Sequence, residues 1–242
     1  MIFFSHRSYE KELLDGDNIP FKHIRQNMEE LDTINHYLGG HKITLAGVKA
    51  LLKDIPNSST VQVVEIGSGG GDNLRVITEW ARKVKREVRL LGVDYNKECV
   101  AYAEGQSKNK GIRFMHSDYK EVQFPEKPDI LFSSLFCHHF GDEELVFMLQ
   151  WMQQNSRVGF FINDLHRHPL AYYSIKSITQ LFSKSYLVKN DAPLSVQRGF
   201  TRKDWERLFA LAGITPYHCQ WKWAFRWLVT YLHAHDDHRN NI

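Results

Sequence analysis

The segment Val61–Leu74, VQVVEIGSGGGDNL, constrains the fold of this chain more than any other. A run of β-branched and apolar residues ends at Glu65 and Ile66, passes into a loop with four glycines, and reopens as a helical pattern. This order predicts a strand, a tight turn and a helix. Glycine permits positive φ values and a close approach of ligand to backbone, and the amides at a helix start carry partial positive charge. The segment therefore predicts a binding site for a nucleoside-containing cofactor.

The glycine spacing argues against a dinucleotide cofactor. The dinucleotide fingerprint reads G-x-G-x-x-G, and its last glycine falls on Asp72 when the motif starts at Gly67. It falls on Leu74 when the motif starts at Gly69. Because neither position is glycine, the loop does not match a pyrophosphate site of this kind.

The loop instead resembles motif I of the class I S-adenosylmethionine-dependent methyltransferases, which reads acidic-x-G-x-G-x-G. The residues at the matching positions are Glu65, Gly67, Gly69 and Gly71. The resemblance implies S-adenosyl-L-methionine as the cofactor and S-adenosyl-L-homocysteine as the product.

Two later strand ends strengthen this resemblance. The apolar run Val88–Val93 ends in Asp94, where a doubly wound sheet places a carboxylate that accepts hydrogen bonds from the ribose hydroxyls. The next short strand is followed by Ser117 and Asp118, and the resemblance implies that Asp118 binds the adenine amino group. The cofactor-binding residues expected from these loops are Glu65, Gly67, Ser68, Gly69, Gly71, Asp94, Tyr95, Asp118, Tyr119 and Ser134.

The order of the strands predicts an α/β fold with a Rossmann-like, doubly wound, seven-stranded sheet. The segments PDILFSS and SRVGFFIND supply a fourth and a fifth strand. The alternation of aromatic and basic residues from Trp221 to Trp227 predicts two terminal strands. We therefore expect a mostly parallel sheet with one antiparallel edge strand, as in the class I methyltransferases.

Helical patterns surround this sheet. Apolar residues at three- and four-residue steps predict an N-terminal helical cap within residues 1–55, ahead of the methyltransferase domain at residues 56–242. Residues 170–182 and 202–212 are expected to form helices, and residues 190–200 a loop. The chain has no internal repeat, so we expect one domain that includes the cap.

Length and composition limit the remaining classes of function. A chain of 242 residues with 43% hydrophobic residues can bury one full core, and a net charge of +3 is too small to indicate a nucleic-acid partner. The three cysteines lack metal-ligand spacing and are expected to be free thiols, and no metal is expected. No apolar run approaches the roughly 20 residues that span a bilayer, so we expect a cytoplasmic protein. The oligomeric state stays open, a homodimer included, and the segment HAHDDH is expected to be a solvated tail.

The resemblance extends over most of the chain. The segments LDTINHYLGG, SSLFCHHF, INDLHRHPLAYY and DAPLSVQRGFTRKDW resemble bacterial small-molecule methyltransferases related to the ubiquinone and menaquinone methylases, which are associated with phenolic or polyketide products. The D/N-P-P-Y/F signature of adenine and glutamine N-methylases is replaced by SSLF. The expected reaction is methyl transfer to oxygen, or to an activated ring carbon, of a small aromatic, phenolic or quinone acceptor. A methyltransferase of RNA or protein and a non-catalytic cofactor-binding module stay open as alternatives.

A phenolic acceptor requires a base or a positive neighbour, because its pKa is about 10. Histidine suits proton transfer at neutral pH, and ligands of open α/β sheets lie beyond the carboxyl ends of the strands. The catalytic candidates on these loops are His138, His139 and Asp164. The candidates for substrate binding are His166, Arg198 and Tyr172. The alternatives are that one of the first two histidines packs under the cofactor while the other caps a helix, and that Arg198 pairs with Asp191.

Overall fold

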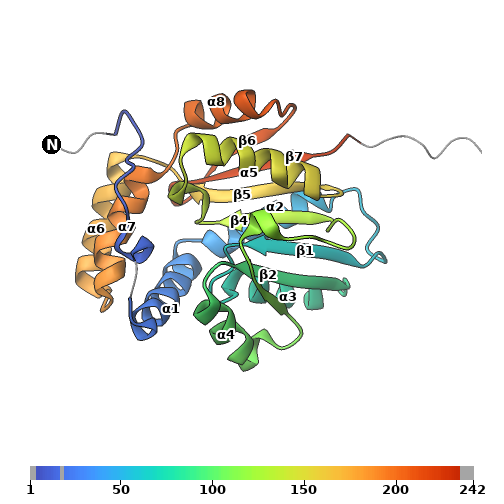
Figure 1. Cartoon of the computed structure of the whole chain (residues 1–242), viewed down its shortest axis with the longest axis horizontal. Helices are drawn as coiled ribbons and strands as arrows, with labels where there is room; N and C mark the ends of the chain where they lie inside the picture. Colours follow the sequence, from blue (N-terminus) through green and yellow to red (C-terminus); the bar gives the residue numbers. More distant parts are fainter. Residues whose placement is uncertain (1–3, 17–18, 235–242) are drawn as a thin grey trace, which may run out of the picture.

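The computed structural model describes residues 4–16 and 19–234, and within them the chain forms one seven-stranded sheet with helices on both faces (Figure 1). The strand order is β3-β2-β1-β4-β5-β7-β6. The strands are β1 (Val61–Ile66), β2 (Val88–Asp94), β3 (Arg113–His116), β4 (Ile130–Ser134), β5 (Gly159–Leu165), β6 (His218–Lys222) and β7 (Arg226–Leu232). The HAHDDH tail expected from the sequence lies outside the described residues from position 235 onward.

The predicted fold class is confirmed. Strands β1 to β5 pair in parallel, and β7 runs antiparallel to both β5 and β6. The antiparallel strand therefore lies one position inside the edge formed by β6. The alternating residues from Trp221 to Trp227 fall on these two strands and the turn between them, but burial does not alternate: β6 is exposed or half-buried and β7 is buried on both faces.

The two faces of the sheet are covered by different helices. The helices are α1 (Phe21–Tyr37), α2 (Gly40–Leu51), α3 (Asp72–Lys83), α4 (Lys97–Gly105), α5 (Asp142–Asn155), α6 (Pro169–Phe182), α7 (Tyr186–Arg198) and α8 (Arg202–Ala212). Helices α5 and α8 bury apolar side chains against one face, and α2 and α3 bury theirs against the other. None of the helices in the described residues is both long and apolar enough to cross a membrane.

A helical group stands at the carboxyl ends of the parallel strands. Helices α1, α6 and α7 lie together with the 3-10 turn η1 (Leu13–Asp15) on the left of Figure 1, beyond the ends of β1, β4 and β5. The loop after β4 contributes a second 3-10 turn, η4 (Cys137–His139), which contacts α7. This group forms a roof over the edge of the sheet where ligands of doubly wound folds bind.

The prediction of a loop at residues 190–200 is wrong, because most of this segment belongs to α7. Ser185 caps the helix by accepting a hydrogen bond from the Val188 amide, and Pro193 lies inside the helix. An interior proline costs a backbone hydrogen bond, but burial of the apolar face of α7 outweighs that cost. The predicted helices at 170–182 and 202–212 are confirmed. The second is capped at its carboxyl end by Gly213 in the left-handed backbone conformation.

Candidate active site

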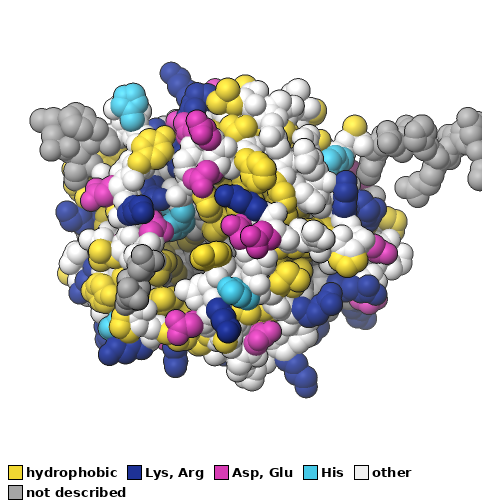
Figure 2. All heavy atoms as spheres, viewed as in Figure 1, with side chains coloured by type: hydrophobic (Ala, Val, Ile, Leu, Met, Phe, Trp, Pro, Cys, Tyr) yellow, Lys and Arg dark blue, Asp and Glu magenta, His cyan; other side chains and the backbone are white. Residues whose placement is uncertain are grey.

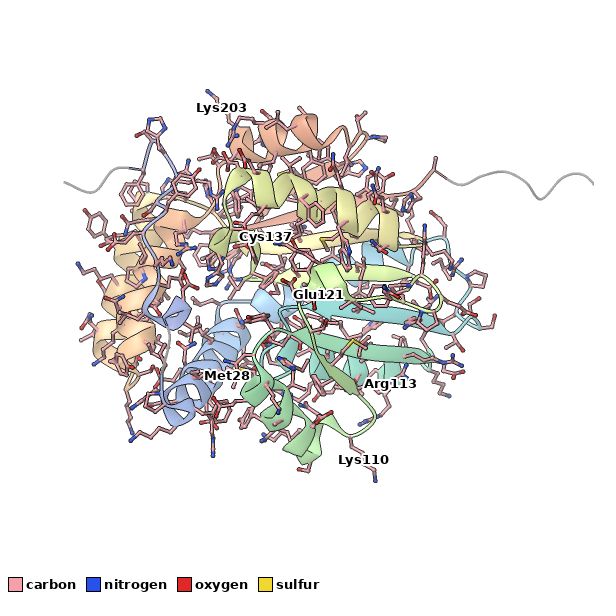
Figure 3. All side chains as sticks on the ribbon, viewed as in Figure 1. Met28, Lys110, Arg113, Glu121, Cys137 and Lys203 are labelled. Atoms are coloured by element: carbon pink, nitrogen blue, oxygen red, sulfur yellow. The ribbon has the colours of Figure 1, made fainter. Side chains whose placement is uncertain are left out.

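A cavity of about 1210 Å³ opens between the strand ends and the helical roof. Its walls come from the loops after β1, β2, β3 and β4, and from α1 and η1. Met28, labelled on α1 in Figure 3, is one of the side chains on the roof side. The position agrees with the rule that doubly wound sheets bind ligands at the carboxyl ends of their strands.

The glycine loop forms the floor of this cavity. Gly67, Gly69 and Gly71 all have positive φ values, of 72°, 47° and 76°. A Cβ at Gly67 would lie 2.4 Å from the ring of Phe136, so a side chain is excluded by space as well as by backbone conformation. Gly67 and Gly69 line the cavity, whereas Gly71 lies behind it as the N-cap of α3.

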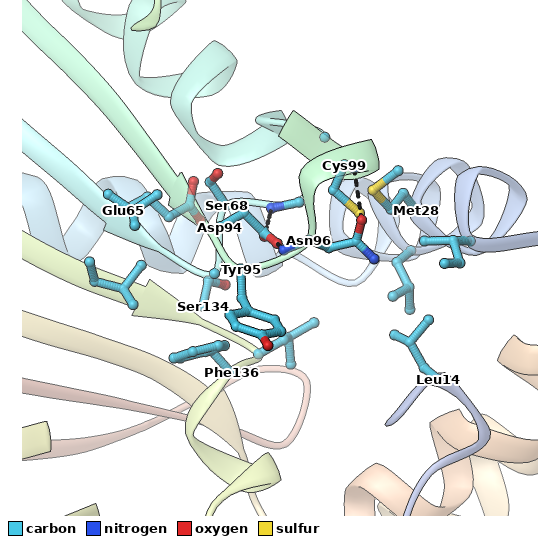
Figure 4. Close-up of a pocket in the computed structure, with 18 of the residues that line it drawn as sticks. Leu14, Met28, Glu65, Ser68, Asp94, Tyr95, Asn96, Cys99, Ser134 and Phe136 are labelled. Atoms are coloured by element: carbon cyan, nitrogen blue, oxygen red, sulfur yellow. Dashed lines mark hydrogen bonds between the residues drawn. The ribbon is translucent and has the colours of Figure 1, made fainter. Parts of the chain in front are cut away.

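Asp94 lines the cavity at the end of β2 and is tied to the glycine loop. Its Oδ2 accepts a hydrogen bond from the Gly69 amide at 2.8 Å, and its Oδ1 accepts one from the Asn96 amide at 2.9 Å (Figure 4). Burial raises the pKa of Asp94, and the two amides offset part of this effect. The carboxylate is thus held in one orientation at the place where a ribose would lie.

Glu65 supplies an unpartnered buried oxygen at the same place. Its Oε1 accepts a hydrogen bond from Asn73 at 2.8 Å, but its Oε2 has no partner. Burial, reinforced by the nearby charge of Asp72, raises the pKa of Glu65 well above its ordinary value. A cationic amino group at this oxygen would relieve the cost of burying it, and S-adenosylmethionine carries such a group. The residues at this end of the cavity therefore fit that cofactor.

The other predicted cofactor-binding residues lie around the same rim. All of them except Gly71 line the cavity. Asp118 follows β3 and caps a 3-10 turn, and Tyr119 beside it is buried with its hydroxyl unpartnered. Ser134 ends β4, and the exposed Tyr95 follows Asp94 (Figure 4).

The remaining walls of the cavity carry both apolar and polar side chains. The apolar side chains on them are Leu14, Ile19, Ile24, Met28, Leu31, Leu135, Phe136 and Phe140. His139 stands among them, and its Nδ1 lies 2.9 Å from Asp15 Oδ1. Burial alone would lower the pKa of His139, but the hydrogen bond to Asp15 and the charge of Glu12 raise it above its ordinary value. Sequence reasoning missed Leu14 and Asp15, because no local pattern shows that η1 folds back over a loop 124 residues away.

The structure places the predicted catalytic residues in two layers. His139 lines the cavity, whereas His138 and Asp164 are buried behind it and do not. Asp164 Oδ1 lies 2.8 Å from His138 Nδ1. Burial alone would raise the pKa of Asp164, but the adjacent His138 lowers it. Neither histidine caps α5, which begins after Gly141.

The predicted substrate-binding residues do not line the cavity. Arg198 is buried and donates hydrogen bonds to the carbonyl oxygens of His138, His139 and Glu10 and to the Asp15 carboxylate. It does not pair with Asp191, whose carboxylate accepts hydrogen bonds from the first amides of η1. His166 accepts a hydrogen bond from Trp221, and Tyr172 packs edge-on against Phe4.

Comparison with protein families identifies the central part of the chain. Residues 63–159 match the family model described as a methyltransferase domain, and they include the glycine loop, Asp94, Asp118 and η4. The chain therefore contains a methyltransferase domain, and the resemblance predicted from motif I is confirmed. Two curated relatives, protein arginine N-methyltransferase 5 of Oryza sativa subspecies indica and japonica, are 26% identical over 137 residues. That match covers 52% of this chain but only 21% of the relatives' length.

Solved structures share the fold at low sequence identity. The plantazolicin methyltransferase BpumL, in complex with S-adenosylhomocysteine, superposes with a TM-score of 0.62 at 15% identity, covering 86% of this chain and 87% of that one. Human N-acetylserotonin methyltransferase, in complex with S-adenosylmethionine, gives 0.60 at 17% identity, covering 86% and 55%. The magnesium protoporphyrin IX methyltransferase of Synechocystis PCC 6803 gives 0.54 at 15% identity, covering 81% and 84%. The fold of this chain is that of these methyltransferases.

Proposed function

We propose that this protein transfers the methyl group of S-adenosylmethionine to oxygen, or to an activated ring carbon, of a small aromatic acceptor. The observation that carries the proposal is the cavity in which Gly67, Asp94 and the unpartnered oxygen of Glu65 meet. These groups match the needs of an adenosyl amino acid, since the glycine loop permits close approach and the two acids accept hydrogen bonds. Residues up to 55 are proposed to act as the cap of this site within a single domain.

The chain's own residues have separate tasks in this reaction. Asp94 holds the ribose, Asp118 the adenine, and Glu65 the ammonium group of the cofactor. The bound cofactor supplies an electrophilic methyl group on sulfur. The protein then has to hold the acceptor in line with that group and to promote loss of the acceptor proton. His139 is proposed to take part in the second task, because it lines the cavity and an imidazole suits proton transfer at neutral pH.

The nature of the walls supports a small aromatic acceptor. Apolar side chains of α1, η1 and the loop after β4 can enclose a planar ring. The methyltransferases with the same fold are named for plantazolicin, N-acetylserotonin and magnesium protoporphyrin, which are small molecules. On the face shown in Figure 2, basic and acidic side chains are interspersed. That face lacks the continuous basic surface by which proteins hold a nucleic acid backbone.

Cofactor binding by purified protein tests the proposal directly. We expect calorimetry to give a micromolar-range dissociation constant for S-adenosylhomocysteine. Asp94→Ala should weaken binding about 100-fold, because it removes an acceptor of two charge-assisted hydrogen bonds. The control is Asp54→Ala, which removes an exposed acid outside the cavity and should leave binding unchanged. Equal affinities in the two variants would contradict the assignment of the cofactor site.

Turnover separates a methyltransferase from a module that only binds the cofactor. Phenols and quinols are offered together with a methyl-labelled donor, and label in the acceptor is measured. His139→Ala should lower turnover without weakening the binding of S-adenosylhomocysteine. A protein that binds the cofactor but labels none of the small acceptors, while labelling an RNA or a protein, would favour the alternative acceptor classes.

A further inference from the structure

Three side chains with metal-binding atoms meet beside the apolar end of the cavity: Glu12, His138 and His139. The Nε2 atoms of the two histidines lie 3.6 and 3.9 Å from the two carboxylate oxygens of Glu12. One potential ligand atom from each of the three residues lies within 4.8 Å of the others. Glu12 and His138 are buried, and His139 lines the cavity, so the cluster can be reached from one side.

Each imidazole is oriented by a second carboxylate. His138 Nδ1 lies 2.8 Å from Asp164 Oδ1, and His139 Nδ1 lies 2.9 Å from Asp15 Oδ1. Because a carboxylate oxygen only accepts, each Nδ1 carries the hydrogen, and each Nε2 of a neutral ring directs its lone pair toward Glu12. A carboxylate that fixes the far nitrogen of a histidine in this way is typical of the residues around metal ligands.

The distances favour a metal ion over a shared proton between these groups. Two lone pairs that face a buried carboxylate repel it unless a positive species lies between them. A proton shared between nitrogen and oxygen requires a separation of roughly 2.7–3.2 Å, which both observed distances exceed. Two ligand atoms about 2.0 Å from a tetrahedral zinc ion lie roughly 3.3 Å apart. The observed distances of 3.6 and 3.9 Å, which lead to different oxygens of Glu12, are somewhat longer, so the three side chains would close in on a bound ion.

The charges near the cluster also allow a cation. Among the three carboxylates, Glu12 and Asp15 lie within ion-pair distance of Arg198, and the charges of Arg7 and Arg226 act on Asp164. One arginine thus serves the two carboxylates that flank His139. Ser195 donates a hydrogen bond to Glu12 Oε1 at 2.8 Å, and His139 Nε2 lies 3.9 Å from Glu12 Oε2. The other three-residue group of this kind, at His41, differs because Arg75 already pairs with its Asp32 at 2.9 Å.

We propose that Glu12, His138 and His139 bind one divalent transition-metal ion, with a fourth coordination position open to the cavity. Two imidazoles and one carboxylate with an open position form the ligand set of catalytic zinc sites. The role of the ion rests on the proposed function. The ion would lower the pKa of an acceptor hydroxyl bound at the open position, so that the proton could pass to water and the oxygen could take the methyl group as its bond to sulfur breaks. His139 then acts as a ligand and not as a free base.

Zinc binding by the full chain, measured without any methyl donor, tests the site. The protein carries His235→Asn and His238→Asn throughout, because the HAHDDH segment offers competing imidazoles. After treatment with a chelator, Zn²⁺ is titrated in competition with a chromophoric chelator, and Co²⁺ serves as a spectroscopic probe of tetrahedral coordination. We expect one ion per chain. Glu12→Gln and His138→Ala should each weaken binding about 100-fold or more, and Asp15→Asn about 10- to 100-fold.

Two control variants match these changes elsewhere in the molecule. His41→Ala alters the second three-residue group, and His168→Ala alters the histidine pair after β5, so neither should change zinc affinity. Binding of S-adenosylhomocysteine by every variant shows that the fold is retained and reports on the cofactor site separately from the metal. If His138→Ala fails to fold, the nearly isosteric Glu12→Gln decides the question. The proposal would be overturned if Glu12→Gln bound zinc as tightly as the wild type. It would also be overturned if His41→Ala were the one variant that bound zinc more weakly.

Discussion

The two ends of the cavity are built in different ways. The cofactor end joins strand ends that follow one another along the chain, such as Gly69 and Asp94, whose hydrogen bond spans 25 residues. The other end, where we propose that the acceptor binds and which we call the acceptor end, joins η1 to η4 and α7, and the contact between Asp15 and His139 spans 124 residues. The topology of the sheet fixes the first end, whereas a few buried polar contacts hold the second. We therefore expect substitutions at the two ends to separate cofactor binding from acceptor turnover.

Gly67→Ala should have the largest effect, and it acts on the cofactor end. The new Cβ would meet the Phe136 ring at 2.4 Å in a backbone conformation with φ of 72°. Overpacking and the positive φ together should lower the free energy of unfolding by about 3 kcal/mol, and S-adenosylhomocysteine should bind about 100-fold more weakly. Denaturant unfolding and calorimetry measure the two effects.

Gly105→Ala is the matched control for this change. Gly105 is the last residue of α4, and a Cβ there would meet nothing within 4 Å. Stability should stay the same or rise by up to about 1 kcal/mol, with cofactor affinity unchanged. Wild-type affinity in Gly67→Ala would show that the loop does not shape the cofactor site.

The contrast between the two ends also explains how far the sequence could predict the structure. The strand order and the positions of Glu65, Asp94 and Asp118 follow from local patterns, because each acid comes directly after an apolar strand. The folding of η1 over the cavity depends on contacts with Asp191 and Arg198 far along the chain. No local pattern carries that information.

The prediction of a loop at residues 190–200 fails because tertiary contacts override local preference. Asn190, Asp191, Pro193 and Ser195 favour turns in isolation, but tertiary burial stabilises this segment as part of helix α7, which ends at Arg198. The sequence predicts that Arg198 binds the substrate, because its charge could neutralise a phenolate or a carboxylate. The structure instead uses its planar set of donors to satisfy buried carbonyl groups.

Arg198→Met should have the next largest effect, and it acts on the acceptor end. The guanidinium donates to three carbonyl oxygens and to Asp15, over distances of 2.7 to 3.0 Å. Methionine keeps much of the volume but leaves these acceptors unpaired, so the free energy of unfolding should fall by about 2 to 3 kcal/mol. Affinity for S-adenosylhomocysteine should stay within about twofold while kcat/KM for the acceptor falls.

Arg198→Lys sharpens this prediction. A lysine ammonium can reach one or two of the acceptors but cannot reproduce the planar set, so partial recovery of stability is expected. If Arg198→Met lost as much affinity for the cofactor as it lost acceptor turnover, the two ends of the cavity would not act independently.

Glu65→Gln should have a smaller effect, and its size depends on pH. Burial raises the pKa of Glu65 well above its ordinary value, so the folded state keeps a proton that the unfolded chain has already released. Stability of the wild type therefore falls as pH rises from the unfolded pKa through the folded one, by about 1.4 kcal/mol per pH unit at most. The variant lacks this slope, so its stability relative to the wild type should grow with pH.

Denaturant unfolding at several values between about pH 5 and pH 8 measures this difference. Glu104→Gln, which changes an exposed acid on α4, provides the control and should follow the wild type. Parallel stability curves for Glu65→Gln and the wild type would refute the account of the buried carboxylate. Weaker cofactor binding by Glu65→Gln is expected as well, because an amide pairs less strongly with an ammonium group.

Loss of one helix cap beside either end of the cavity should have the smallest effect on stability and binding. Asn96 caps α4 by accepting hydrogen bonds from the amides of Glu98 and Cys99, and Ser185 caps α7 through the amide of Val188. Each substitution by alanine should lower the free energy of unfolding by about 1 kcal/mol. Asn96 also lines the cavity beside Asp94, so Asn96→Ala should weaken the binding of S-adenosylhomocysteine about two- to threefold.

Ser185→Ala should instead raise the acceptor KM at unchanged cofactor affinity, because α7 supports η1 and η4. Equal effects on both ligands in both variants would mean that the two ends respond as one cooperative unit.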